Sequence, residues 1–206
     1  MKIEKLEDIL KTRLPGLMDA RRAYAVLVPL VEREGELYLL YEVRAKSLRR
    51  QPGEVCFPGG RMEEGESPEE CALRETWEEL AIPPERVRLL GRLDFIAHRA
   101  SFLMQPVLGV VEEKALERMV PSPAEVDEVF FVPLSHLLET DPIEYDYDLI
   151  PAPAERFPYE LIGIPRDYKW QLGHENVPVY LWQGRAIWGL TGRITRNLVR
   201  ICKAPG

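Results

Sequence analysis

The chain has 206 residues, of which 46% are hydrophobic and 30% are charged, and its formal net charge is −7 at pH 7. This balance is typical of one soluble globular domain over residues 1–206, without the basic excess of most nucleic-acid-binding proteins. Because of this charge, we do not expect nucleic acid as a partner. No apolar run approaches the roughly 20 residues of a membrane span, so we do not expect a membrane as a partner either.

The cysteine and histidine content points to a protein without disulfides or zinc. The three cysteines have no framework spacing, and the N-terminal residues lack the pattern of a signal peptide. We therefore expect reduced thiols in a cytoplasmic protein. None of the three histidines pairs with a cysteine at the spacing of zinc ligands, which argues against a zinc site.

The first predicted elements are an amphipathic helix over residues 2–14 and a hairpin of two strands over 23–32 and 37–43. Apolar residues at helical spacing indicate the helix, and apolar and β-branched runs around Glu34-Gly35-Glu36 indicate the hairpin. A basic loop, RAKSLRRQPGE, follows the hairpin.

The second half of the chain predicts more strands and two more helices. The strands cover residues 87–96, 101–111, 129–133 and 177–182, and the helices cover 133–139 and 187–202. Pro106 should place the middle of its strand at a sheet edge or a bulge. Residues 141–178, rich in proline and aromatics, read as an ordered insertion. Strands before, between and after helices favour the α/β (α+β) class.

The segment FPGGRMEEGESPEECALRETWEELAI places an acidic helix after two glycines. Ser67 as the cap, Pro68 at the first helical position and Glu70 three residues after the cap predict where the helix begins. On that helix, three glutamates fall within an arc of roughly 100°; they are Glu75, Glu78 and Glu79. Such carboxylates suit a hard cation, Mg²⁺ or Mn²⁺, although a solvated acidic face is the alternative.

This segment resembles the Nudix box, the signature of hydrolases of nucleoside diphosphates linked to another moiety. The matching residues over 60–82 are Gly60, Glu66, Arg74, Glu75, Glu78, Glu79 and Ile82. Thr76 and Ala81 depart from the apolar residue and the glycine of the pattern. The resemblance implies an α/β/α sandwich with a mixed central sheet.

The resemblance also implies the roles of the matching residues. The expected metal ligands are Glu75, Glu78 and Glu79, with a backbone carbonyl near Gly60. Arg74 would orient Glu75, and Glu66 would support that arrangement. The general base stays open between these box acids and two loop acids, Glu125 and Glu128. The expected catalytic set is therefore Glu75, Glu79, Arg74 and Glu128.

The basic loop resembles the extra motif of the coenzyme A pyrophosphatase branch. Arg44, Arg49 and Gly53 stand at its spacing before Phe57-Pro58-Gly59-Gly60, whereas Glu42 occupies the position of its threonine. We expect substrate to contact Arg44, Arg49, Gly59 and Gly60.

The branch implies metal-dependent hydrolysis of coenzyme A to 4′-phosphopantetheine and 3′,5′-ADP, by a possible homodimer. Two alternatives stay open for the sequence. The substrate could be ADP-ribose, a dinucleoside polyphosphate or NADH. The protein could instead bind coenzyme A or a nucleotide without turnover.

Overall fold

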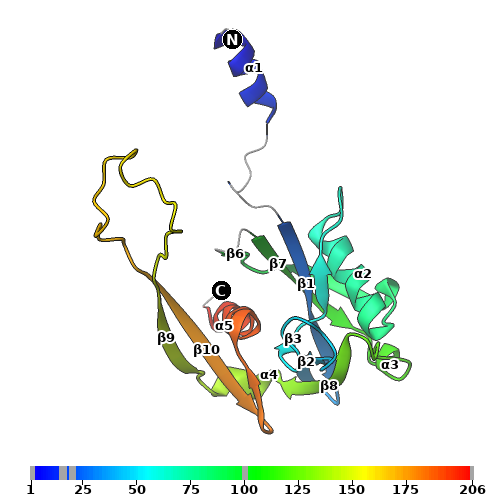
Figure 1. Cartoon of the computed structure of the whole chain (residues 1–206). Coiled ribbons are helices and arrows are strands. Elements are labelled where there is room, and N and C mark those ends of the chain that lie inside the picture. The colour runs from blue at the N-terminus through cyan, green and yellow to red at the C-terminus, as the bar shows by residue number, and fades with distance from the viewer. Residues whose placement is uncertain (1–2, 14–17, 19–21, 99–101, 205–206) are drawn as a thin grey trace.

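The computed structural model describes residues 3–13, 18, 22–98 and 102–204. The helices are α1 (Ile3–Thr12), α2 (Pro68–Leu80), η1 (Pro84–Arg86), α3 (Glu113–Leu116), α4 (Leu134–Glu139) and α5 (Gly189–Lys203). The strands are β1 (Arg22–Arg33), β2 (Glu36–Arg44), β3 (Val55–Cys56), β4 (Gly59–Arg61), β5 (Val87–Arg92), β6 (Ile96–His98), β7 (Phe102–Val111), β8 (Val126–Pro133), β9 (Ile143–Leu149), β10 (Gly173–Trp182) and β11 (Arg185–Ile187). Figure 1 shows α2 and α5 on opposite sides of the main sheet.

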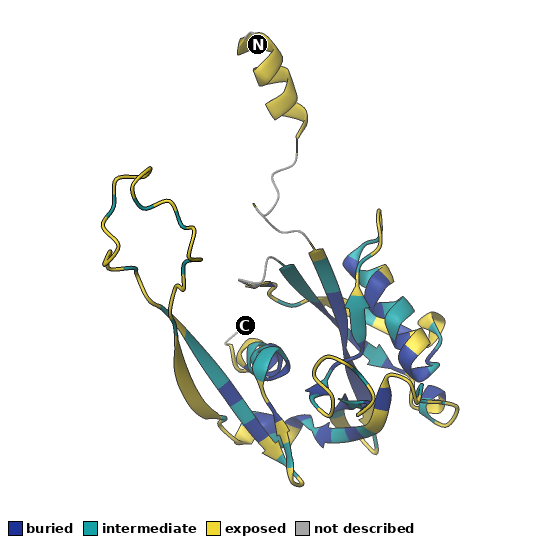
Figure 2. Cartoon of the chain, in the orientation of Figure 1, coloured by how far each residue is buried: buried dark blue, intermediate teal, exposed yellow. Residues whose placement is uncertain are grey.

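The main sheet is mixed because its central strand, β1, pairs with both parallel and antiparallel strands. β1 pairs antiparallel with β2 and β4, and parallel with β7. Its side chains alternate between two cores: Val26 and Val28 pack with α5, whereas Ala25 and Leu27 pack with α2. This confirms the expected α/β/α sandwich, and Figure 2 shows the buried residues concentrated in these layers.

The predicted edge or bulge at Pro106 is wrong. β7 lies inside the sheet, between β1 on one side and β5 and β6 on the other. Proline is tolerated there because β5 ends opposite Val107 and β6 begins opposite Met104. The Pro106 carbonyl accepts a hydrogen bond from Leu93 N on that side, so the missing N–H faces the break between β5 and β6.

The predicted insertion contains a hairpin that extends from the sandwich. β9 and β10 pair antiparallel from Ile143↔Val179 to Leu149↔Gly173, so the predicted strand 177–182 begins earlier than expected. The connecting loop holds its own edge-to-face aromatic contacts, centred on Phe157 and Trp170. Figure 1 shows this arm beside α5, with its loop standing away from the main sheet.

The helices agree with the sequence prediction in position. α1 lies within the predicted range 2–14, of which residues 2 and 14 fall outside the described part, and it has no buried residue. α5 begins two residues later than predicted, after β11. No helix in the described residues is long and apolar enough to cross a membrane.

Candidate active site

The acidic helix α2 has well-defined ends. The Ser67 hydroxyl accepts a hydrogen bond from Glu70 N at 3.2 Å, and the Glu70 carboxylate accepts one from Ser67 N at 2.8 Å. This is the predicted capping box. At the other end, Ala81 adopts the left-handed conformation with φ 56° and donates its N–H to the Trp77 carbonyl. Alanine thus fills a position where the family pattern has glycine, at a cost of roughly 1 kcal/mol.

The two glycines before α2 lie directly against the helix carboxylates. Gly59 N donates to Glu79 Oε2 at 2.8 Å. A Cβ atom on Gly60 would lie 2.3 Å from the carboxylate of Glu75, so only glycine leaves room for that side chain. β4 carries both glycines and pairs with β1, which fixes them opposite Val26 and Ala25.

Arg74 organises the acidic residues of the box. Its Nε donates to Glu66 Oε1 at 2.8 Å, and its Nη1 donates to Glu75 Oε1 at 2.8 Å. The same Nη1 lies 3.4 Å from Glu78, and Nη2 donates to the Arg61 carbonyl at 3.2 Å. Arg74 therefore holds Glu75 in place from the side of the helix.

The box carboxyls have opposite pKa shifts. The hydrogen bond from Arg74 lowers the pKa of Glu66 to about 2. Burial raises the pKa of Glu75 above its usual value, against the effect of Arg74. Burial also raises the pKa of Glu79, and the nearby charge of Glu42 raises it further. The positive charge near Glu75 and Glu79 therefore does not offset the cost of burying their ionised forms.

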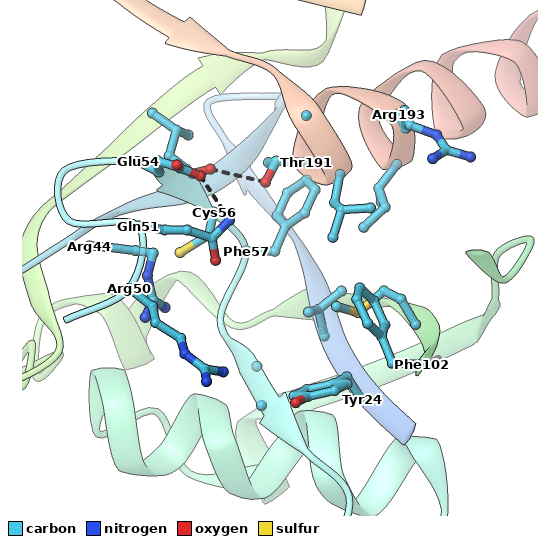
Figure 3. A pocket seen from close by; sticks show the side chains of 18 of the residues that line it. Tyr24, Arg44, Arg50, Gln51, Glu54, Cys56, Phe57, Phe102, Thr191 and Arg193 are labelled. Carbon is cyan, nitrogen blue, oxygen red and sulfur yellow. Dashed lines mark hydrogen bonds between the residues drawn. The ribbon is translucent and has the colours of Figure 1, made fainter. Parts of the chain in front are cut away.

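These carboxyls border a cavity of about 770 Å³. Figure 3 shows Arg44 and Arg50 reaching in from one side, whereas Tyr24 and Phe102 lie together on another. Thr191, near the N-terminus of α5, donates to the Val55 carbonyl at 2.9 Å and ties the helix to the cavity wall. The volume is typical of a small-molecule site.

The structure brings most of the predicted site residues to this cavity. The predicted residues that line it are Arg44, Gly59, Gly60, Glu75 and Glu79. Arg74 lies behind Glu75 as its hydrogen-bond donor. Glu125, the alternative loop acid, also lines the cavity.

Besides Arg74, three predicted residues are not among the lining residues. Arg49 is exposed, and its neighbour Arg50 lines the cavity instead. Glu78 points outward, with 53% of its side chain exposed. Glu128 forms an ion pair with Arg185. The structure thus brings together two of the three predicted carboxylate ligands, and Glu125 is nearer to the cavity than Glu128.

The donor chemistry of the site fits a hard divalent cation, although the described residues form no finished cage. Within that part of the chain, no group of three or more His, Cys, Asp or Glu side chains is arranged to hold a metal ion. Glu75 and Glu79 nevertheless both line the cavity, and the glycine turn leaves space for them. Carboxylate oxygens, water and substrate phosphates are the ligands that Mg²⁺ prefers.

Several cavity residues were missed by the sequence prediction. Arg193 on α5 forms an ion pair with Glu175 on β10, so two distant segments share this wall of the cavity. Tyr24 and Phe102 come from neighbouring strands, β1 and β7. Alternation along β1 marks Tyr24 as sharing a face with Val26, but only the strand order shows that this face borders the cavity.

Comparisons with known proteins agree with this geometry. A model of the NUDIX domain matches residues 21–152. Nudix hydrolase 3 of Caenorhabditis elegans is 36% identical over 197 residues, which cover 92% of this chain and 78% of that protein. Mouse (Mus musculus) mitochondrial coenzyme A diphosphatase NUDT8 is 33% identical over 205 residues, which cover 98% of this chain and 88% of that protein.

A further relative matches a shorter region. Mouse (Mus musculus) peroxisomal coenzyme A diphosphatase NUDT7 is 40% identical over 116 residues, which cover 56% of this chain and 48% of that protein. Two of these relatives are named for peroxisomes and mitochondria, so the cytoplasmic location of this chain stays a prediction. The family match, together with the box carboxylates and their arginine, leads to one conclusion: the chain belongs to the NUDIX family.

Proposed function

We propose that this protein hydrolyses the diphosphate bond of coenzyme A or a derivative of it, with a bound divalent cation, Mg²⁺ or Mn²⁺. The products are 4′-phosphopantetheine and 3′,5′-ADP. The observation that carries the proposal is the presence, in one cavity, of the half-buried carboxyl of Glu75, the buried carboxyl of Glu79 and the arginine Arg44 of the basic loop. The names of two relatives, which are coenzyme A diphosphatases, support this choice of substrate.

The chemistry is the addition of water to one phosphorus of the diphosphate. The water oxygen bonds to that phosphorus, and the bond from it to the bridging oxygen breaks. The bridging oxygen leaves with the second phosphate and takes the bonding electron pair, while the water proton passes to a carboxylate. A bound cation would neutralise the diphosphate and lower the pKa of the attacking water.

Residues of this chain provide the positioning. Arg74 holds Glu75 through the 2.8 Å bond to Oε1, and the Gly59 N–H holds Glu79 through Oε2. One oxygen of each carboxylate is thus held by a fixed donor, and this sets the direction of the other oxygen. Such an arrangement suits two ligands that bind the same ion. Arg44 has its Nε buried without a partner among the described residues, so a phosphate oxygen of the substrate would satisfy it.

The base that takes the water proton has two kinds of candidate. Glu75 and Glu79 lie next to the expected cation position, and Glu125 lines the cavity from the loop before β8. Glu128 is paired with Arg185, which would have to release it first. Separate Gln substitutions at these positions distinguish them, because loss of the base lowers kcat with little change in KM.

The test of the proposal is product identification with several substrates. The purified protein is incubated with coenzyme A, an acyl-coenzyme A or ADP-ribose, in Mg²⁺, in Mn²⁺ and in EDTA. We expect 4′-phosphopantetheine and 3′,5′-ADP by mass spectrometry, the highest kcat/KM with a coenzyme A compound, and no turnover in EDTA. Turnover of ADP-ribose alone would refute the substrate assignment, and binding of coenzyme A without turnover would refute catalysis.

The control for this test is the Glu79→Gln variant. It keeps the size of the side chain and an oxygen that can accept the Gly59 N–H, but it removes the negative charge. We expect it to fold, to bind coenzyme A and to lose at least a hundredfold in kcat, on the order of the loss from a displaced catalytic group. Full activity in this variant would show that the box carboxyls do not act in the reaction.

A further inference from the structure

A second group of side chains borders the cavity beside the glycine turn, and its parts have no role in the proposed chemistry. We call it the strand-end patch; it consists of Arg22, Tyr24, Arg61 and Phe102, all of which line the cavity. Pairing between three adjacent strands creates it. Tyr24 lies opposite Arg61 on β4, and Arg22 lies opposite Phe102 on β7. Side chains at opposite positions on one face of a sheet are close neighbours.

The patch combines aromatic surface with positive charge. The rings of Tyr24 and Phe102 are 5.4 Å apart at an interplanar angle of 73°, and both are half-buried. Figure 3 shows the two rings side by side at the edge of the cavity. An aromatic surface of this kind suits a purine, because every base has a π face that can stack.

The two arginines of the patch are available for an anion. Neither Arg22 nor Arg61 forms a salt bridge with a described residue, whereas Arg193 in the same cavity is paired with Glu175. Two contacts fix the Arg61 backbone: its carbonyl accepts a hydrogen bond from Arg74, and the residue pairs with Tyr24 on β1. Guanidinium groups with this freedom bind phosphate through paired N–H donors.

The position of the patch relates it to the reacting bond. Arg61 directly follows Gly60, at which an added Cβ would lie 2.3 Å from the Glu75 carboxylate. A diphosphate held at Glu75 therefore has the patch as its neighbour one residue farther along β4. We propose that the strand-end patch binds the adenosine 3′-phosphate end of the substrate, with the purine on Tyr24 and the 3′-phosphate between Arg22 and Arg61.

This inference rests on the proposed function for the identity of the substrate, and it adds the direction in which the substrate lies. The pantetheine end then extends toward the basic loop, where Arg44 and Arg50 line the opposite side in Figure 3. The rival arrangement is the reverse, with the 3′-phosphate on Arg44 and Arg50. The two arrangements differ in which arginines recognise the 3′-phosphate.

Direct binding of nucleotides tests the patch without turnover. Calorimetry of the full chain measures the Kd of 3′,5′-ADP and of 5′-AMP for the wild type, Arg61→Gln, Arg22→Gln and Arg50→Gln. We expect the wild type to prefer 3′,5′-ADP, and either patch substitution to weaken 3′,5′-ADP by about tenfold or more while 5′-AMP changes little. The Arg50→Gln control should keep the preference.

Two results would overturn the inference. One is a wild type that binds 3′,5′-ADP no better than 5′-AMP, and the other is a preference lost in Arg50→Gln but kept in both patch variants. Stacking is tested with Tyr24→Leu, which should weaken both nucleotides, and with Tyr24→Phe, which should weaken neither. Equal affinities for wild type and Tyr24→Leu would place the purine elsewhere.

Kinetics separate failure of this inference from failure of the proposed function. The ratio of kcat/KM for coenzyme A to that for dephospho-coenzyme A should fall about tenfold or more in Arg61→Gln, because only coenzyme A carries the 3′-phosphate. Absence of turnover with both substrates would refute the proposed function and leave the calorimetry to decide on the patch. Turnover with an unchanged ratio in both Arg22→Gln and Arg61→Gln would refute the patch alone.

Discussion

Arg74 is the residue on which the geometry of the box carboxyls depends. It donates to Glu66 and Glu75 at 2.8 Å, and these two pairs are 27% exposed or less at each side chain. Lysine keeps the positive charge but has no planar fork, so it cannot hold both acids at once. We expect Arg74→Lys to lower kcat by about 10- to 100-fold, the usual cost of losing a residue that orients a metal ligand.

The matched control for Arg74→Lys is Arg92→Lys. Arg92 also pairs with an acid of α2, Glu69, at 2.7 Å, but its side chain is 53% exposed and lies away from the cavity. Steady-state kinetics with coenzyme A should show wild-type kcat in Arg92→Lys. An equal loss in both variants would mean that disturbance of α2, and not release of Glu75, lowers the rate.

Gly60 provides a second test of the position of Glu75. Its φ lies outside the positive region, so alanine adds no backbone strain, but the new Cβ would meet the Glu75 carboxylate at 2.3 Å. We expect Gly60→Ala to lower kcat by on the order of a hundredfold, because small displacements of catalytic groups have effects of this size. The shorter acid in Gly60→Ala/Glu75→Asp should restore part of the rate, and no restoration would argue against a steric cause.

At the residue scale, the sequence predicted that the box carboxylates share one face of the helix, but it did not predict how exposed each of them is. Glu75 and Glu79 were found because their helical spacing places them on one face, and that face meets the cavity. Glu78 lies within the same arc but is exposed, because the helix rotation relative to the sheet is set by packing of residues such as Cys71 and Ala72. The periodicity of the sequence alone does not predict that rotation.

At the scale of elements, the capping box at the start of α2 should contribute measurably to the free energy of unfolding. Ser67 and Glu70 form reciprocal hydrogen bonds that satisfy free N–H groups of the first turn. Ser67→Ala removes one partner, and we expect it to lower the free energy of unfolding by about 1 kcal/mol. For a chain of this length that corresponds to a fall in Tm of about 2–4 °C.

The Ser67→Ala measurement is a denaturant titration together with kinetics. The cap lies at the opposite end of α2 from Glu79, so kcat should stay near its wild-type value in the folded protein. An unchanged unfolding midpoint would mean that water replaces the cap at no cost. A large loss of kcat would mean that the cap also positions the glycine turn.

Elements with strong local signals were predicted well, and elements set by tertiary contacts were not. The hairpin of β1 and β2 and the limits of α2 follow from alternation, turn residues and caps. The interior place of β7 could not be predicted, because proline is acceptable there only where β5 and β6 leave a break. β9 was missed although its sequence, IEYDYDL, alternates apolar and acidic residues; all but its last residue are exposed, so no buried face accompanies that alternation.

At the scale of the whole molecule, the cavity gathers both signs of charge within an acidic protein. Its lining residues include five arginines and five glutamates, among which are Arg44, Arg61, Glu75, Glu79 and Glu125. The net charge of the chain is −7. A cavity lined by both signs of charge fits the proposed function, in which a cation binds among the carboxyls and a polyanionic substrate binds to the arginines.

The buried acids make stability depend on pH and on metal in a predictable direction. Burial raises the folded-state pKa of Glu75, Glu79 and Glu42 above the usual value of 4.5. A raised pKa in the folded state gives a contribution to stability that is present below 4.5 and is lost as the pH rises toward the raised value. In EDTA, we therefore expect Tm to fall as the pH rises from about 6 to about 8.5.

Added Mg²⁺ should oppose this fall, because a cation among the carboxyls favours their ionised forms. Differential scanning fluorimetry at each pH, with EDTA or with Mg²⁺, measures both effects, and the stabilisation by Mg²⁺ should be larger at the higher pH. Glu79→Gln removes one buried acid and should reduce the pH dependence in EDTA. Glu64→Gln, at an exposed position of the same segment, should leave it unchanged. A Tm in EDTA that rises over this pH range, or a stabilisation by Mg²⁺ that is unaffected by Glu79→Gln, would contradict the assignment of these carboxyls to the cation.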